Sequence, residues 1–175
     1  MADVCEVMLR AMEMEEDSQR FYLDAASVAT NPLARRTFEA LAEWEVEHKK
    51  LLQSVYDEAA TTGGCPTLDH LSPEQVEIIE EAALIFKTAL EDIEDTLAHD
   101  PTLEGAYATA MGKERMAIAF YRQQLDETHN ENERQLYQFL LDQERGHLNL
   151  LATTEEYLND TKYWHFKQEQ WIVTG

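Results

Sequence analysis

The chain has 175 residues, enough for one domain with a proper core, and a formal net charge of −21. Binding to nucleic acid or to an anionic membrane surface needs clustered Lys and Arg, so this charge argues against both partners. The acidity either concentrates cations near the protein or belongs to solvated outer faces of helices.

The composition favours helices. Gly and Pro are scarce, at 6 and 4 residues, and no stretch alternates polar and apolar residues for long enough to predict a sheet. The two cysteines, Cys5 and Cys65, form no Cys-x-x-Cys pair, which argues against a rubredoxin or zinc ribbon within the chain. The first residues lack an apolar run, so we expect no signal peptide, no membrane span and a cytoplasmic location.

Capping residues and prolines mark where the helices begin. Three prolines directly follow a side chain that can cap a helix: Asn31-Pro32, Ser72-Pro73 and Asp100-Pro101. Asn130, with Glu133 three residues later, forms a predicted capping box. These signals predict a Gly-rich loop over 60–72. They also predict five helices, over residues 3–29, 32–59, 73–98, 101–128 and 131–158.

The first two predicted helices carry ionisable residues in the middle of apolar faces. The first helix has Glu15 and, two turns later on the same face, Tyr22. The second has Glu45 and His48, which share one face because they are three residues apart. A charged Glu on an apolar face is costly unless something neutralises it.

The predicted helix 73–98 differs, because its apolar stripe has no polar member. We expect it to lie in a crossover over residues 60–100, between two pairs of helices. There it would cover the flank of the bundle or pair with a second subunit. The latter alternative agrees with our expectation of a homodimer or larger homo-oligomer.

The last two predicted helices repeat the first two. Glu114, Tyr121, Glu144 and His147 each lie 99 positions after their counterparts (114 minus 15, 147 minus 48). The repeat predicts an all-α fold, a four-helix bundle over residues 1–160 built from two repeated helix pairs. The aromatic tail, 161–175, is expected to pack onto the bundle.

One lone Glu and one Glu-x-x-His on each helix pair form the ligand set of a dinuclear carboxylate site in such a bundle. Four glutamates balance the charge of two divalent ions, and mixed oxygen and nitrogen ligands suit Fe or Mn, with Zn able to compete. The candidate ligands are Glu15, Glu45, His48, Glu114, Glu144 and His147.

Other polar residues have simpler interpretations. Tyr22 and Tyr121 either donate hydrogen bonds to the ligand carboxylates or are core aromatics whose hydroxyls reach solvent or backbone. The remaining residues considered are predicted to be ordinary surface groups: Glu16, Glu43, Glu47, His70, His99, His129 and His165.

The four motif segments resemble the rubrerythrin branch of the ferritin-like superfamily. The resemblance implies an antiparallel, ferritin-like four-helix bundle with a long crossover and a di-iron site that reacts with peroxide or O2, and it makes the six candidate ligands the iron ligands. The chain departs from the family pattern at Ala117, where the family has an extra Glu; Ser18 is the repeat counterpart of that position. The segments are MEMEEDSQRFY, FEALAEWEVEHKKLL, MGKERMAIAFY and FLLDQERGHLNLL.

The resemblance predicts an oxidoreductase. Two Fe ions would reduce hydrogen peroxide, or activate O2, with electrons from a separate rubredoxin-like or flavin donor. Two alternatives remain: a ferroxidase or iron-storage protein of ferritin type, and a non-catalytic protein whose metal site is a structural cross-link.

Overall fold

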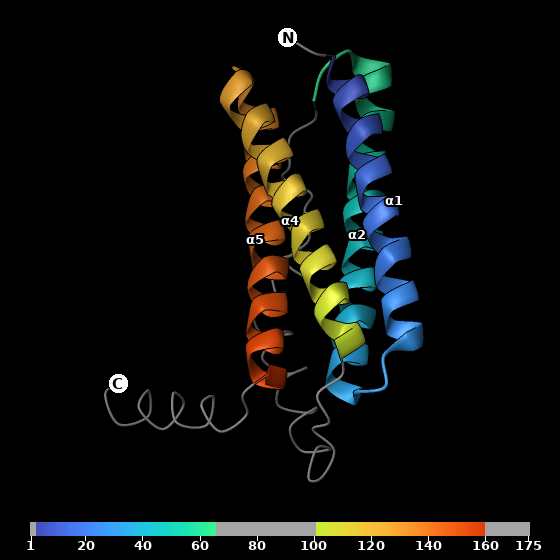
Figure 1. Ribbon diagram of the computed structural model, residues 1–175. Helices are drawn as coiled ribbons and strands as arrows, with labels where there is room; N and C mark the ends of the chain where they lie inside the picture. The colour runs from blue at the N-terminus through green and yellow to red at the C-terminus, as the bar shows by residue number, and fades with distance from the viewer. Residues whose placement is uncertain (1–2, 66–100, 160–175) are drawn as a thin grey trace, which may run out of the picture.

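The computed structural model describes residues 3–65 and 101–159, and within these ranges it contains four helices and no strand (Figure 1). The helices are α1 (Val4–Val28), α2 (Pro32–Thr62), α4 (Pro101–Glu127) and α5 (Glu131–Asn159). The predicted all-α, ferritin-like bundle is thereby confirmed.

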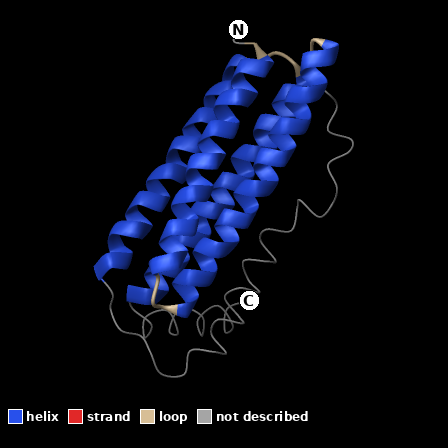
Figure 2. Cartoon of the chain, turned by 90° about the vertical axis from the view of Figure 1, so that its right-hand side faces the viewer, coloured by secondary structure: helices blue, strands red, loops and turns tan. Residues whose placement is uncertain are grey.

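The helices form two hairpins that lie side by side along one axis (Figures 1 and 2). One hairpin is α1 with α2 and the other is α4 with α5, and α2 packs on α5 as α1 packs on α4. Helices α2 and α4 run in the same direction, so the end of α2 and the start of α4 lie at opposite ends of the bundle (Figure 1). The connection itself, over residues 66–100, lies outside the described residues, so the predicted crossover stays a prediction.

The first hairpin begins and turns as its capping residues predict. The Asn31 side chain accepts hydrogen bonds from the backbone N–H groups of Leu33 and Ala34, at 2.9 and 3.1 Å. Helix α2 continues to Thr62, so the predicted loop over 60–72 was wrong at its start. The helix ends instead at Gly63, whose φ of 77° is the left-handed conformation that favours glycine at this position.

The second hairpin turns with a modified cap. As predicted, Asn130 Oδ1 accepts from the N–H groups of Asn132 and Glu133. The Glu133 carboxylate does not close the predicted capping box. It accepts a 2.6 Å hydrogen bond from the Thr128 hydroxyl, whose oxygen in turn accepts from the Asn130 N–H. Thr128 thus takes the role that the sequence pattern gave to Glu133.

The core consists of two apolar clusters with the ionisable residues between them along the helices. One cluster contains Met8, Leu52, Tyr121, Leu136, Tyr137 and Leu140 among its members. The other contains Tyr22, Phe38, Leu41, Tyr107 and Leu151. The packing of both clusters therefore fixes the positions of the four helices on either side of the candidate site.

Several predictions fall outside the described residues: the helix 73–98, the tail 161–175, and His70, His99 and His165. Among the helices that are described, none is both long enough and apolar enough to cross a membrane.

Candidate metal centre

The six candidate ligands come together from four helices in the middle of the bundle, and all are at least 96% buried. Helices α1 and α4 contribute the lone Glu15 and Glu114, while α2 and α5 contribute the two Glu-x-x-His pairs. Ligand atoms of one group lie within 4.8 Å of one another: Glu45, His48, Glu144 and His147.

Glu45 and Glu144 each place one carboxylate oxygen beside each histidine. Glu45 Oε2 lies 3.3 Å from His48 Nδ1, and its Oε1 lies 3.7 Å from His147 Nδ1. Glu144 Oε1 lies 3.1 Å from His48 Nδ1, and its Oε2 lies 3.6 Å from His147 Nδ1. Both carboxylates therefore occupy positions from which they could bridge two ions.

The lone glutamates lie at the two ends of this arrangement. Glu15 Oε2 is 3.8 Å from His48 Nδ1, and Glu114 Oε2 is 3.6 Å from His147 Nδ1. Each lone Glu therefore approaches the histidine of its own helix pair. The cluster divides into two half-sites, Glu15 with His48 and Glu114 with His147, which share Glu45 and Glu144.

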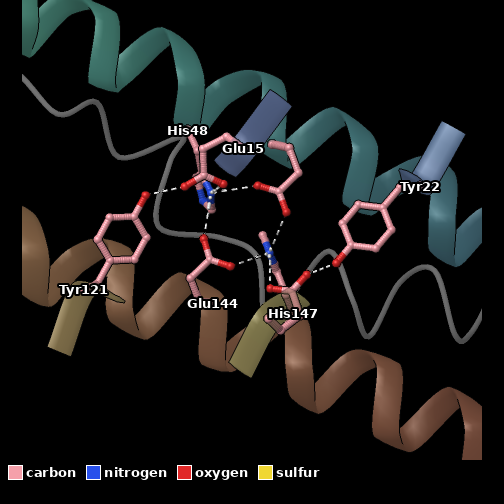
Figure 3. A network of polar contacts seen from close by, with 8 residues as sticks. Glu15, Tyr22, His48, Tyr121, Glu144 and His147 are labelled. Atoms are coloured by element: carbon pink, nitrogen blue, oxygen red, sulfur yellow. Dashed lines mark hydrogen bonds and ion pairs between the residues drawn. The ribbon is translucent and has the colours of Figure 1, made fainter. Parts of the chain in front are cut away.

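The two tyrosines hold the lone glutamates from across the bundle. Tyr22 of α1 donates its hydroxyl hydrogen to Glu114 of α4, and Tyr121 of α4 donates to Glu15 of α1 (Figure 3). Burial, followed by the negative charge of nearby glutamates, raises the pKa of both phenols well above the usual value. Both hydroxyls therefore keep their protons and remain hydrogen-bond donors.

The electrostatics of the metal-free cluster show a need for positive charge. Burial and then the charges of Glu15 and Glu144 raise the pKa of Glu45 well above its usual range. Burial and then the Glu144 charge raise the pKa of Glu114 to about 8. Burial also opposes ionisation of Glu144, but His147 and His48 outweigh it and hold the pKa of Glu144 well below its usual range.

The histidines respond in the opposite sense to burial. Burial lowers the pKa of each imidazole, but the adjacent carboxylates outweigh this effect. The pKa of His147 rises to about 9, chiefly through Glu114 and Glu144, and the pKa of His48 is raised well above its usual value, chiefly through Glu144. Without a metal, protons on these rings supply the positive charge that the carboxylates require.

The donor atoms of the cluster fit metal ions. In the described part of the chain, the buried side-chain N and O atoms without a hydrogen-bond partner belong to this cluster, apart from the Tyr107 hydroxyl. They include both oxygens of Glu45, one oxygen each of Glu114 and Glu144, and the nitrogens of both histidines. Orphaned polar atoms are costly in a protein interior, and metal coordination would satisfy them.

The predicted surface residues with described side chains lie outside the cluster. Glu43, Glu47 and His129 are exposed, and so is Glu16, which accepts a 2.7 Å hydrogen bond from Lys49. The structure thus separates the buried glutamates from their exposed neighbours as the helical spacing predicts.

Sequence reasoning did not identify Trp44, which lies directly before Glu45. Its ring stacks on His147, with centroids 5.2 Å apart and planes 11° from parallel. The His147 ring also stacks on His48, at 5.1 Å. Trp44 is a bulky aromatic residue on the inward side of α2, and its size could have marked it as a core residue. Helical spacing alone does not predict which side chains it contacts across the bundle.

Sequence reasoning also missed a pocket of about 550 Å³ between α1 and α4. Glu15 lines it, together with Ala117 and its repeat counterpart Ser18. Small side chains at these repeat-related positions were the signal, although a pocket cannot be located from one helix face alone.

Comparison with known proteins places this geometry in a family. The family model described as Rubrerythrin matches residues 6–155, which include all six candidate ligands and both tyrosines. Neither the curated proteins nor the solved structures yield a match to this chain. Together, the family match and the buried Glu/His cluster support a di-iron protein.

Proposed function

The chain belongs to the rubrerythrin family, and on this premise we propose that it is a peroxidase that reduces hydrogen peroxide at a dinuclear iron site. A separate rubredoxin-like or flavin protein would supply the electrons. We assign as iron ligands Glu15, Glu45, His48, Glu114, Glu144 and His147.

The observation that carries this proposal is the paired placement of Glu45 and Glu144. Each carboxylate has one oxygen beside Nδ1 of each histidine, and all of these atoms except Glu144 Oε2 lack a hydrogen-bond partner among the described residues. A mononuclear site would not need two carboxylates in bridging positions. The four glutamates and two divalent ions also make a neutral buried unit, which is tolerated where four unpaired carboxylates are not.

The chain's own residues would orient and protect this centre. When bound, two ferrous ions supply the two electrons and the Lewis acidity that cleavage of a peroxide O–O bond requires. Tyr22 and Tyr121 hold the lone glutamates through their hydroxyl hydrogens. The two apolar clusters exclude water from both ends of the site.

We propose peroxide rather than O2 as the oxidant because the family implies it. Turnover with peroxide should be limited by re-reduction, since electrons must arrive from a separate protein. The closest competing function is that of a ferroxidase, in which O2 oxidises ferrous iron and mineralised ferric iron accumulates.

The test is anaerobic reconstitution with ferrous iron, followed by metal analysis and stopped-flow absorbance. We expect two iron ions per chain, and faster oxidation of the reduced protein by hydrogen peroxide than by O2. One ion or fewer per chain would contradict the dinuclear site. Faster oxidation by O2 with growing ferric particles would instead support the ferroxidase function.

A further inference from the structure

The pocket between α1 and α4 is much larger than hydrogen peroxide requires. Its volume of about 550 Å³ lies in the range of sites for small organic molecules, roughly 300–1,000 Å³, whereas a water-sized molecule occupies about 30 Å³. Glu15 is among the residues that line the pocket, so the pocket lies against the part of α1 that carries a candidate metal ligand.

The walls of the pocket combine apolar and small side chains with charged or polar ones, namely Arg10, Glu13, Asp17, Lys113 and Gln123. Met14 of α1 faces it together with Met116 and Phe120 of α4, and these side chains offer flexible or flat apolar surface. Ser18 and the buried Ala117 leave room between the two helices. This lining suits a compact hydrocarbon group, because burying apolar surface stabilises the complex.

Two cations from opposite helices, Arg10 and Lys113, line the pocket. The Arg10 guanidinium of α1 lies over the Phe120 ring of α4, 5.1 Å from its centroid. The Lys113 ammonium of α4 lies 5.7 Å from the Phe21 ring centroid of α1 and donates to the Asp17 carbonyl at 3.3 Å. These cation–π contacts join α1 and α4 on either side of Ala117 and so hold the two helices at a fixed distance around the pocket.

We propose that this pocket binds the organic group of an alkyl or aryl hydroperoxide, so that organic hydroperoxides are substrates of the same centre. The proposal rests on the peroxidase function and names a substrate class for it. The organic group would pack on Met14, Met116 and Phe120, while the hydroperoxide group would point past Ala117 toward Glu15.

The reaction balances with the electrons already assigned to the centre. The O–O bond of ROOH breaks, and two electrons with two protons convert the fragments into the alcohol ROH and water. The reduced dinuclear centre supplies the two electrons and is oxidised by two equivalents, and the external donor protein restores them. Protons come from solvent, which reaches the pocket through its open side.

Binding is tested first, on the full-length metal-free protein, with cumyl alcohol as the probe. This alcohol is the product of cumene hydroperoxide and cannot be reduced further. We expect saturable shifts in the NMR signals of the Met14, Met116 and Ala117 methyl groups. In Ala117→Leu the added side chain fills the pocket and should weaken binding at least about tenfold. The exposed Ala108, on the same helix but outside the pocket, provides the control Ala108→Leu, which should bind as the wild type does.

Turnover is tested second, on the iron-loaded protein, with cumene hydroperoxide and hydrogen peroxide in parallel. Ala117→Leu should lower the ratio of kcat/KM for the organic substrate to that for hydrogen peroxide at least about tenfold, mainly through KM. Ala108→Leu should leave this ratio unchanged.

The outcomes separate the two proposals. Absence of cumyl alcohol binding, or an unchanged ratio in Ala117→Leu, overturns the organic-substrate inference while hydrogen peroxide reduction still supports the peroxidase. If the alcohol binds but neither peroxide is reduced, the peroxidase function and the substrate role of the pocket both fail.

Discussion

The two helix pairs carry the same ligands at repeat-related positions, yet the surroundings of the ligands differ. Glu45 and Glu144 are counterparts, but the pKa of Glu45 is raised by burial and nearby carboxylates whereas the pKa of Glu144 is held low by the two histidines. Trp44 stacks on a histidine, whereas its repeat counterpart is Gln143. Repetition in sequence therefore preserves the ligand positions without preserving the direction in which the pKa of each ligand is shifted.

This difference teaches how a metal-free site remains folded. The two imidazoles favour a negative charge on Glu144, whereas burial and the neighbouring carboxylates disfavour one on Glu45. The two proposed bridging positions are therefore electrostatically unequal, although both half-sites share them.

The largest expected effect is a loss of bound metal, and it should be the same for the two helix pairs. Glu45→Ala and Glu144→Ala should each lose at least one of two metals, because each removes a proposed bridging carboxylate. Glu43→Ala and Glu47→Ala are matched controls, since both side chains are exposed on the same helix as Glu45. Metal analysis after anaerobic reconstitution checks this, and two ions in either bridging variant would contradict the bridging assignment.

A second pair of variants should reveal the difference between the helix pairs. In the metal-free protein, Glu144→Gln should lower the free energy of unfolding by about 3 kcal/mol, because it removes the buried anion that pairs with both histidines. Glu45→Gln should cost less than about 1 kcal/mol, because burial and the neighbouring carboxylates disfavour the charge that Gln lacks. Urea unfolding at neutral pH measures both, and equal losses would show that the two carboxylates carry equal charge.

The pH dependence of stability sharpens the same comparison. Folding raises the pKa of Glu114 from 4.5 to about 8 and that of His147 from 6.5 to about 9. The folded state therefore keeps protons that the unfolded chain releases, so stability from these groups is present at low pH and is lost as pH rises. The metal-free protein should lose on the order of 2 kcal/mol of unfolding free energy as the pH rises from 4.5, the unfolded pKa of Glu114, to about 9, the folded pKa of His147.

Metal loading should remove most of this dependence, because metal ions replace the protons. Unfolding of the metal-free and loaded proteins across a pH series is the measurement. If the metal-free protein instead became more stable as the pH rose from about 6 to about 9, by an amount similar to the expected loss, the prediction would be wrong in sign.

The smallest expected effects concern the tyrosines, which should again behave alike. Tyr22→Phe and Tyr121→Phe should each lower the free energy of unfolding by about 1–2 kcal/mol, since each deletes a buried hydrogen bond to a carboxylate. Tyr107→Phe is the control, because the Tyr107 hydroxyl is buried but donates no hydrogen bond to a carboxylate in the part of the chain that the structure describes. Thermal unfolding that ranks the control with the other two would show that these losses come from packing alone.

Much of the fold could be predicted from local signals. The repeat and the Asn31-Pro32 cap give the helices and their turn, and the Glu-x-x-His spacing places both residues on one face. The ends of the helices were predicted less accurately. Helix α2 continues up to Gly63, which has a positive φ, and the repeat gives no signal at this position. These are local properties, and local spacing is what a sequence displays directly.

Contacts between helices were harder to predict. Spacing places Tyr22 on the same face as Glu15, yet its hydroxyl meets Glu114 on another helix. In the same way, nothing in the residues around Ala117 shows that α1 and α4 leave a pocket there. Such features depend on how far apart two helices pack, and this is set by the core as a whole.

Each helix pair donates a hydrogen bond to a carboxylate of the other pair. Tyr22 in the first pair donates to Glu114 in the second, and Tyr121 in the second donates to Glu15 in the first. A single helix pair would therefore carry one Glu, one Glu-x-x-His and a tyrosine with no carboxylate to receive its proton. Two identical copies of such a helix pair would each provide the carboxylate that the tyrosine of the other copy needs. The chain is therefore arranged like a symmetric dimer of helix pairs joined into one polypeptide.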